Sequence, residues 1–199
     1  MKKDPSDDVF EEIKLQYEAG LEIPARKPER QFFLCPVGLI GAGKTTVLKP
    51  LARKLDLLRV SGDEIREILH NRGFGYDRAW EILRRIIEKY AREGYSIASD
   101  TDCASPRTVE VITKLSRELG ARVIWIHINP PEEFIIKKFM GYKHSWLFRD
   151  WEHAVENYRQ RKELHKNLPM KFFYTFDTSK PDIQEKIEEA TELIRKEMH

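Results

Sequence analysis

The chain has 199 residues and a formal net charge of +2 at pH 7, with 41% hydrophobic and 34% charged residues. This length favours one domain with a sizeable core, and the near balance of charge excludes a strongly basic or acidic protein. The start of the chain lacks the pattern of a secretory signal, and no apolar run could cross a membrane. The two cysteines have no metal-ligand spacing, so we expect reduced thiols in a cytoplasmic enzyme without a membrane partner.

Residues 1–30 are predicted to form a helix and a linker. Apolar residues recur at helical spacing over 7–19, and Gly20 ends that pattern. Prolines in the stretch 23–28 then predict a stiff connection. We expect this helix to serve in packing, ahead of a main domain over 31–199.

From residue 31 onward, strands and helices alternate. Strands are predicted at 31–37, 57–61, 95–99, 121–128 and 172–177. Helices are predicted at 46–55, 62–69, 76–93, 107–119, 130–139, 151–166 and from about 181. The alternation predicts an α/β domain whose parallel sheet is covered by helices on both faces. Ligands of such sheets bind beyond the carboxyl ends of the strands, so the residues that follow each strand are the candidate site.

The stretch Gly38–Thr45 matches the phosphate-loop pattern of glycine, four residues, glycine, lysine and then serine or threonine. It lies between a predicted strand and a predicted helix, where amide groups and the helix dipole favour an anion. Lys44 would contact the β- and γ-phosphates of ATP, and the Thr45 hydroxyl would bind Mg²⁺. The residues of this segment expected to contact the nucleotide are Gly38, Gly41, Ala42, Gly43, Lys44, Thr45 and Thr46.

Charged residues follow the second and third predicted strands. Asp63 is a candidate general base for an attacking hydroxyl, although aspartate at this place is also typical of a helix cap. Arg66 lies one turn later and could bind an acceptor phosphate, or simply pair with Asp63 or Asp100. Asp100 ends an apolar strand, where a carboxylate of the Walker B type helps to hold Mg²⁺. The predicted catalytic residues are thus Asp63, Lys44, Arg66 and Asp100, and the predicted metal ligands are Thr45 and Asp100.

Basic residues gather after the fourth predicted strand, namely Lys137, Lys138, Lys143, His144 and Arg149. They either belong to a mobile lid that closes over the transferred phosphoryl group or form an ordinary basic loop. We expect the lid at about 137–166, with Lys138 and Arg149 near the nucleotide.

These motifs resemble the P-loop kinase family that includes polynucleotide 5′-hydroxyl kinases and zeta-toxin-like kinases. The stretches that carry the resemblance are Gly38–Thr45, Ser61–Arg66, Ser99–Asp102, Pro130–Glu133 and Phe176–Ser179. The resemblance implies a three-layer P-loop NTPase fold, with a five-stranded parallel sheet in the order 2-3-1-4-5 and a small helical lid.

The resemblance also implies roles for single residues. Asp63 would be the general base, Arg66 would bind an acceptor phosphate, and Asp100 would be a supporting carboxylate. Thr178 and Ser179 would lie near the adenine. Two positions depart from the family pattern, because Asp102 stands where asparagine is usual and Lys138 stands where a lid arginine is usual. Lysine cannot form the two-pronged contact that arginine forms.

The sequence therefore predicts an enzyme that uses ATP and Mg²⁺ to phosphorylate a hydroxyl group. The first hypothesis for the acceptor is the 5′ end of a nucleic acid, with Arg66 on the neighbouring phosphate. The alternative is a small molecule, phosphorylated or not, such as a sugar nucleotide, a nucleoside or an antibiotic. A third hypothesis is a module that binds ATP without turnover. A GTPase is disfavoured because the guanine signature Asn-Lys-x-Asp is absent from the sequence.

Overall fold

The structure is a computed structural model that describes residues 2–141 and 147–198, without the side chain of residue 164. At its centre is a sheet formed by β1 (Phe32–Val37), β2 (Leu58–Ser61), β3 (Ile97–Asp100), β4 (Arg122–Ile128) and β5 (Tyr174–Phe176). The strand order is β2-β3-β1-β4-β5, and each neighbouring pair is parallel. This confirms the predicted α/β class and the strand order that the family resemblance implied.

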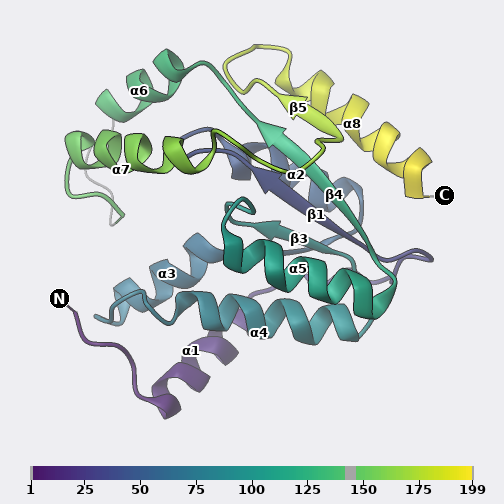
Figure 1. Cartoon of the computed structure of the whole chain (residues 1–199). Helices are drawn as coiled ribbons and strands as arrows, with labels where there is room; N and C mark the ends of the chain where they lie inside the picture. Colours follow the sequence, from purple (N-terminus) through teal and green to yellow (C-terminus); the bar gives the residue numbers. More distant parts are fainter. Residues whose placement is uncertain (1, 142–146, 199) are drawn as a thin grey trace.

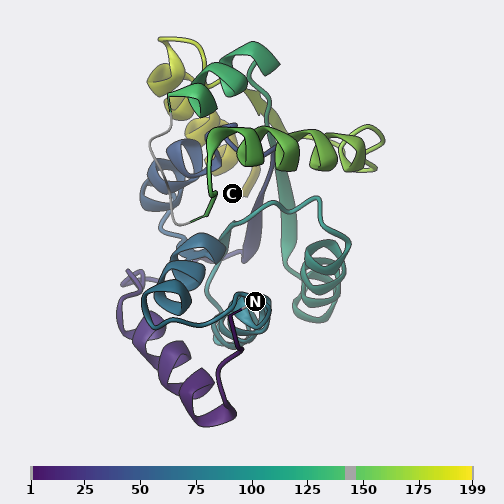
Figure 2. The same cartoon turned by 90° about the vertical axis from the view of Figure 1, so that its left-hand side faces the viewer.

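Helices cover both faces of the sheet. They are α1 (Asp7–Ala19), α2 (Lys44–Lys54), α3 (Gly62–Asn71), α4 (Ala79–Arg92), α5 (Pro106–Leu119), α6 (Glu132–Met140), α7 (Trp151–Leu164) and α8 (Ile183–Met198). Figure 1 shows α2 and α8 on one face and α4 and α5 on the other. In Figure 2, which looks from the side to which the strand arrows point, α7 lies across this end of the sheet. Among the described helices, none combines the length and apolar character that a membrane crossing needs.

The central strand β1 contributes to a hydrophobic cluster on each face of the sheet. Phe33, Cys35 and Val37 pack in the cluster that includes α4 and α5, whereas Phe32 and Leu34 pack in the one that includes α2 and α8. Successive side chains of a strand point to opposite faces, which produces this division. All six residues of β1 are buried, as is typical of a central parallel strand. The segment that follows β1 therefore starts from the middle of the sheet.

Helix α1 has the bounds that its periodicity predicts. Phe10, Ile13 and Tyr17 are buried in the cluster that also contains residues of α3 and α4. Two guanidinium groups, those of Arg78 just before α4 and Arg85 within it, lie 3.9 and 4.9 Å from the centre of the Phe10 ring, in cation–π geometry. The helix thus shares the core of the sheet domain, as the packing role predicted for it requires, while the boundary expected near residue 30 stays a prediction.

The two cysteines are free and fully buried. Cys103 donates a weak hydrogen bond from its Sγ to the Ser99 carbonyl oxygen at 3.7 Å. Burial raises the pKa of the Cys103 thiol well above its ordinary value, so the nucleophilic thiolate is strongly disfavoured. Both side chains therefore serve as small apolar core residues.

Candidate active site

The phosphate-loop motif lies between β1 and α2, as predicted. Gly41 and Gly43 have φ angles of +80° and +90°, a left-handed conformation that glycine adopts at little cost. A Cβ atom added at Gly41 would lie 2.8 Å from the Phe139 ring, and one at Gly43 would lie 3.1 Å from Thr178. The Thr178 hydroxyl also donates to the Ala42 carbonyl oxygen at 2.7 Å. The loop is thus enclosed by α6 on one side and by the segment after β5 on the other.

Replacing Gly38 by alanine should destabilise the fold, because a Cβ atom there would lie 2.7 Å from the Ile128 carbonyl oxygen on β4. The obstacle is backbone in a central strand, which cannot move aside as a side-chain tip could. We expect Gly38→Ala to lower the free energy of unfolding by about 1–3 kcal/mol. Urea unfolding measures this, and Gly20→Ala is the matched control because its Cβ would make only an ordinary 3.5 Å contact. Equal midpoints for the two variants would contradict the expectation.

The Lys44 ammonium group folds back onto the phosphate loop and donates to the carbonyl oxygens of Gly38 at 2.8 Å and Leu39 at 3.1 Å. Burial lowers the pKa of Lys44. Three carboxylates that follow or end β2 and β3 raise this pKa through their negative charge, namely Asp102, Asp63 and Asp100. The charged groups predicted at three neighbouring strand ends are therefore close enough to act on one ammonium group, as a parallel sheet requires.

The predicted metal ligands are in contact with each other. The Thr45 hydroxyl donates to Oδ1 of Asp100 at 3.1 Å, and Oδ2 of Asp100 accepts from Arg59 of β2 at 2.6 Å. Burial raises the pKa of the Asp100 carboxyl group, and the Arg59 guanidinium opposes that rise. Hard oxygen donors of this kind suit Mg²⁺, which usually keeps waters and phosphate oxygens as its other ligands. Within the described residues no cluster of three or more His, Cys, Asp or Glu could hold a metal ion.

The cap of α3 is Ser61 rather than Asp63. The Ser61 hydroxyl oxygen accepts from the Glu64 N–H at 3.4 Å, and the helix begins at Gly62. Asp63 is exposed, and its carboxylate accepts from Arg66 at 2.6 Å. The capping alternative for Asp63 is therefore wrong, and the pairing considered for Arg66 is present. The roles of base and acceptor ligand stay predictions.

Asp102 links the end of β3 to the end of α7. Its Oδ2 lies 2.8 Å from Nε2 of His165, and its Oδ1 accepts from the Ala104 N–H at 3.2 Å. Burial raises the pKa of Asp102, but the hydrogen bond from His165 and the charge of Lys44 outweigh it and hold this pKa below its usual value. The carboxylate that departs from the family pattern thus anchors a helix of the predicted lid region.

The contact of Asp102 with His165 should stabilise the folded protein at neutral pH and lose this effect in acid. A carboxyl group whose pKa is lowered by folding stabilises the protein above its unfolded pKa of about 3.9, and that contribution disappears as the pH falls through the folded value. We expect Asp102→Asn to cost about 1 kcal/mol at neutral pH and progressively less below about pH 4. Thermal unfolding of both proteins across this range tests it, with Glu110→Gln at an exposed position of α5 as the control. A difference that is independent of pH would count against this role of the Asp102 carboxylate.

Of the predicted lid region, helix α6 contacts the phosphate loop, and helices α6 and α7 contact each other. Lys138 of α6 donates to the Gly41 carbonyl oxygen at 3.4 Å, so this lysine does reach the loop. The rings of Phe139 and Tyr158 pack edge to face with their centres 6.3 Å apart, which joins α6 to α7. Arg149 pairs instead with Asp150 at the start of α7, at 3.0 Å. Lys143 and His144 lie outside the described residues, and lid movement stays a prediction.

Thr46, Thr178 and Ser179 are also predicted to contact the nucleotide, and they have different surroundings in the structure. Ser179 donates both its N–H and its hydroxyl to the Asp177 carboxylate, at 2.9 and 2.6 Å. Thr46 is exposed in the first turn of α2. Thr178 is the one of these residues that touches the phosphate loop directly. Contact with a bound adenine remains a prediction for all of them.

A cavity of about 580 Å³ opens beside the phosphate loop, between the carboxyl end of β4 and helix α7. Its charged and polar lining comes from His127, Asn129, Glu132, Lys162, His165, Lys166 and Asp177. The volume lies within the range typical of small-molecule sites. The lining combines the cations Lys162 and Lys166 with the carboxylates Glu132 and Asp177, and Lys162 pairs with Glu132.

Two arginines near the site were not singled out from the sequence. Arg59 interrupts the apolar run of β2, and that interruption was a signal, because a charge in a buried strand needs a partner. Arg161 on α7 lies near enough to Lys44 for its charge to lower the Lys44 pKa. Its place on a polar helix face carries no such signal in the sequence.

Comparisons with known proteins bear on the family and the fold. Residues 34–140 match the family model described as AAA domain (AAA_33). A search of curated proteins found no match.

Several solved structures share the fold. The APS kinase CysC of Mycobacterium tuberculosis, in complex with AMPPNP and APS, is 17% identical with a TM-score of 0.57, and the match covers 84% of this chain and 99% of that chain. A structure from the PezAT toxin–antitoxin system of Streptococcus pneumoniae is 17% identical with a TM-score of 0.59, over 96% and 98% of the two chains. Shikimate kinase from Acinetobacter baumannii, in complex with shikimate, is 19% identical with a TM-score of 0.54, over 85% and 96%.

At these identities the solved structures show a shared fold and nothing finer. The family model matches more than half of the chain, and the matched residues include the phosphate loop, Asp63 and Asp100. It confirms the family resemblance that the motifs indicated. The chain belongs to this AAA domain family and has the P-loop kinase fold.

Proposed function

We propose that the protein is a kinase that moves the γ-phosphate of Mg²⁺-bound ATP to a hydroxyl group of an acceptor. One observation carries the proposal: Asp63 is exposed beside the phosphate loop, takes no part in capping α3, and acts electrostatically on Lys44. A carboxylate in this position can accept the proton of a hydroxyl group that attacks the γ-phosphorus.

The proposed transfer assigns one role each to Lys44 and Asp63 and a shared role to Thr45 and Asp100. Lys44, which donates to loop carbonyl oxygens here, would turn its ammonium group to the β- and γ-phosphates of ATP. Asp63 would take the proton of the acceptor's hydroxyl group as the hydroxyl oxygen bonds to the γ-phosphorus. The bond from the γ-phosphorus to the β–γ bridging oxygen would break at the same time and release ADP. Thr45 and Asp100 would hold Mg²⁺, which neutralises phosphate charge when bound.

Arg66 would couple the binding of the acceptor to the loss of its own pairing with Asp63. In the structure its guanidinium group donates to the Asp63 carboxylate at 2.6 Å. An anionic group on the acceptor would compete for this arginine, since guanidinium binds phosphate in a two-pronged manner. Asp63 would then be free to accept the hydroxyl proton. The proposed acceptor is therefore a hydroxyl compound that also carries a phosphate or another anion.

Two acceptor classes meet this description. The first is the 5′ end of a nucleic acid, whose neighbouring phosphate would bind Arg66. The second is a phosphorylated small molecule, whose phosphate would bind Arg66 in the same way. Three arginines between the end of α3 and the middle of α4 pair with carboxylates of α1, which reduces their availability to a long polyanion. The pairs are Arg72 with Glu12, Arg78 with Asp7 and Arg85 with Glu11.

The test offers ATP labelled at the γ-phosphate together with a 5′-hydroxyl oligonucleotide or with a panel of sugars, nucleosides and their phosphates. Label on the oligonucleotide, with an affinity that falls steeply as salt rises, supports the nucleic acid. Label on a small molecule supports the second class. If no acceptor is labelled and calorimetry with Mg²⁺ detects no ATP binding, the kinase proposal is wrong.

A further inference from the structure

We infer that Tyr17 of the N-terminal helix is a positioning residue for the proposed phosphoryl transfer, because its hydroxyl group fixes the turn that carries Asp63. The inference rests on the proposed function, and it assigns a role in the site to a helix that lies outside the residues matched by the family. The contact is a hydrogen bond of 2.7 Å in which the Ser61 N–H donates to the Tyr17 hydroxyl oxygen.

The position of Ser61 explains why this contact matters. β2 is an edge strand, and Ser61 is its last residue, in register with Asp100 of β3. The Ser61 N–H bonds the hydroxyl of a helical tyrosine instead of another strand. Tyr17 and Ser61 are only 5% and 3% exposed, so water could not easily replace that partner. Loss of the hydroxyl would leave a buried donor unsatisfied at the start of the catalytic turn.

The same turn is held from its other side by the proposed metal site. Ser61 caps α3 by accepting from the Glu64 N–H, and the Glu64 carboxylate pairs with Arg59. Arg59 in turn donates to Asp100, the carboxylate that contacts Thr45. A displacement of Ser61 would therefore shift the start of α3, which bears Asp63. Ser61 would exert this effect although it does not itself contact the phosphate loop.

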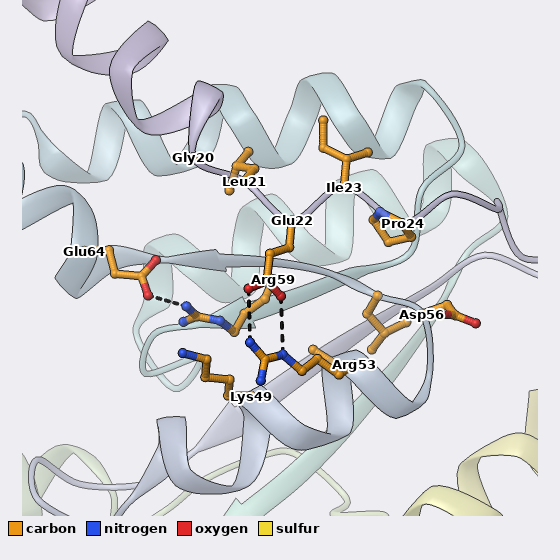
Figure 3. Close-up of a pocket in the computed structure, with 12 residues that line it drawn as sticks. Gly20, Leu21, Glu22, Ile23, Pro24, Lys49, Arg53, Asp56, Arg59 and Glu64 are labelled. Atoms are coloured by element: carbon orange, nitrogen blue, oxygen red, sulfur yellow. Dashed lines mark hydrogen bonds and ion pairs between the residues drawn. The ribbon is translucent and has the colours of Figure 1, made fainter.

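Helix α1 and the linker after it are attached firmly enough to act as a support. Tyr17 shares the core with Phe10 and Ile13. Figure 3 shows the linker passing beside β2 and α2, where Glu22 bonds Arg53 at 3.1 and 3.3 Å and Glu64 bonds Arg59. A cavity of about 460 Å³ lies beside the linker and is also lined by Arg53, Arg59 and Glu64. The Tyr17 hydroxyl links α1 directly to the end of β2.

The experiment compares Tyr17→Phe with Tyr90→Phe in the full chain. Each change deletes one hydroxyl group at the contact of α1 with the domain, since the Tyr90 hydroxyl bonds Glu18 of α1. Only Tyr17 reaches Ser61. For Tyr17→Phe we expect kcat to fall about tenfold with the KM for ATP unchanged within about twofold. Amide hydrogen exchange over residues 58–66 should become at least about tenfold faster.

The control variant Tyr90→Phe should show neither effect. Wild-type kcat and wild-type exchange in Tyr17→Phe would overturn the inference, and so would an equal fall of kcat in both variants, which would indicate general loosening of α1. Hydrogen exchange needs no acceptor and no turnover. If the wild-type protein phosphorylates nothing, the kinase proposal fails, while faster exchange confined to Tyr17→Phe still demonstrates that the hydroxyl fixes this turn.

Discussion

Replacing Asp63 by asparagine should lower kcat about a thousandfold while the affinity for ATP stays the same. General base catalysis contributes roughly a hundredfold to ten-thousandfold, and asparagine cannot accept the proton at neutral pH. Asparagine has nearly the same shape and keeps an oxygen that can accept from Arg66, so the local geometry should persist. The measurement is steady-state transfer of labelled phosphate, with ATP binding followed separately by calorimetry.

The matched control for this substitution is Glu67→Gln, the same loss of charge on an exposed residue one turn further along α3. It should keep the wild-type kcat. Because Ser61 caps the helix, Asp63→Asn should also leave the melting temperature nearly unchanged. An unchanged kcat in Asp63→Asn would exclude the base role and would favour a module that binds ATP without turnover. A loss of ATP affinity with normal kcat would place Asp63 on the nucleotide instead.

Replacing Lys44 by methionine should lower kcat/KM about a thousandfold or more and should also weaken ATP binding. The ammonium group would stabilise charge on the β- and γ-phosphates in a partly desolvated site, where such interactions are strongest. Methionine fills similar space without charge. Steady-state kinetics and ATP titration measure the two effects, and Lys54→Met at the far end of the same helix should alter neither.

The stability of the Lys44→Met variant provides a second check. Burial lowers the pKa of Lys44, so its charge is held in the folded protein at an energetic cost. Methionine removes that cost, together with two hydrogen bonds to loop carbonyl oxygens. These effects oppose each other, and the melting temperature should change by only a few degrees. A large fall in melting temperature would show that lost activity reflects unfolding rather than lost phosphate contact.

Local patterns in the sequence were sufficient for most of the fold. The periodicity of residues 7–19 predicted α1 to the residue, because Phe10, Ile13 and Tyr17 recur at helical spacing. The phosphate loop could be predicted because its glycines, lysine and threonine are adjacent in the chain. Helix ends were less predictable, and α4 begins at Ala79 rather than near residue 76. The strand order came from the family resemblance rather than from spacing.

The contacts that connect the site could not be predicted from spacing, because each joins residues far apart in the chain. Tyr17 meets Ser61 across 44 positions, and Asp102 meets His165 across 63. Periodicity indicated that Tyr17 points inward but not which backbone group it meets there. For Asp63, helix capping and catalysis predict the same residue type, and only the position of Ser61 in space distinguishes them.

The burial of both cysteines has a practical consequence for spectroscopy. Neither sulfur is exposed, so a maleimide dye should leave the native protein unlabelled. A single cysteine introduced at the exposed Glu156 on α7 would then carry one fluorophore at a defined place. Changes in its emission during ATP addition would report movement of that helix in real time, without prior removal of the natural thiols.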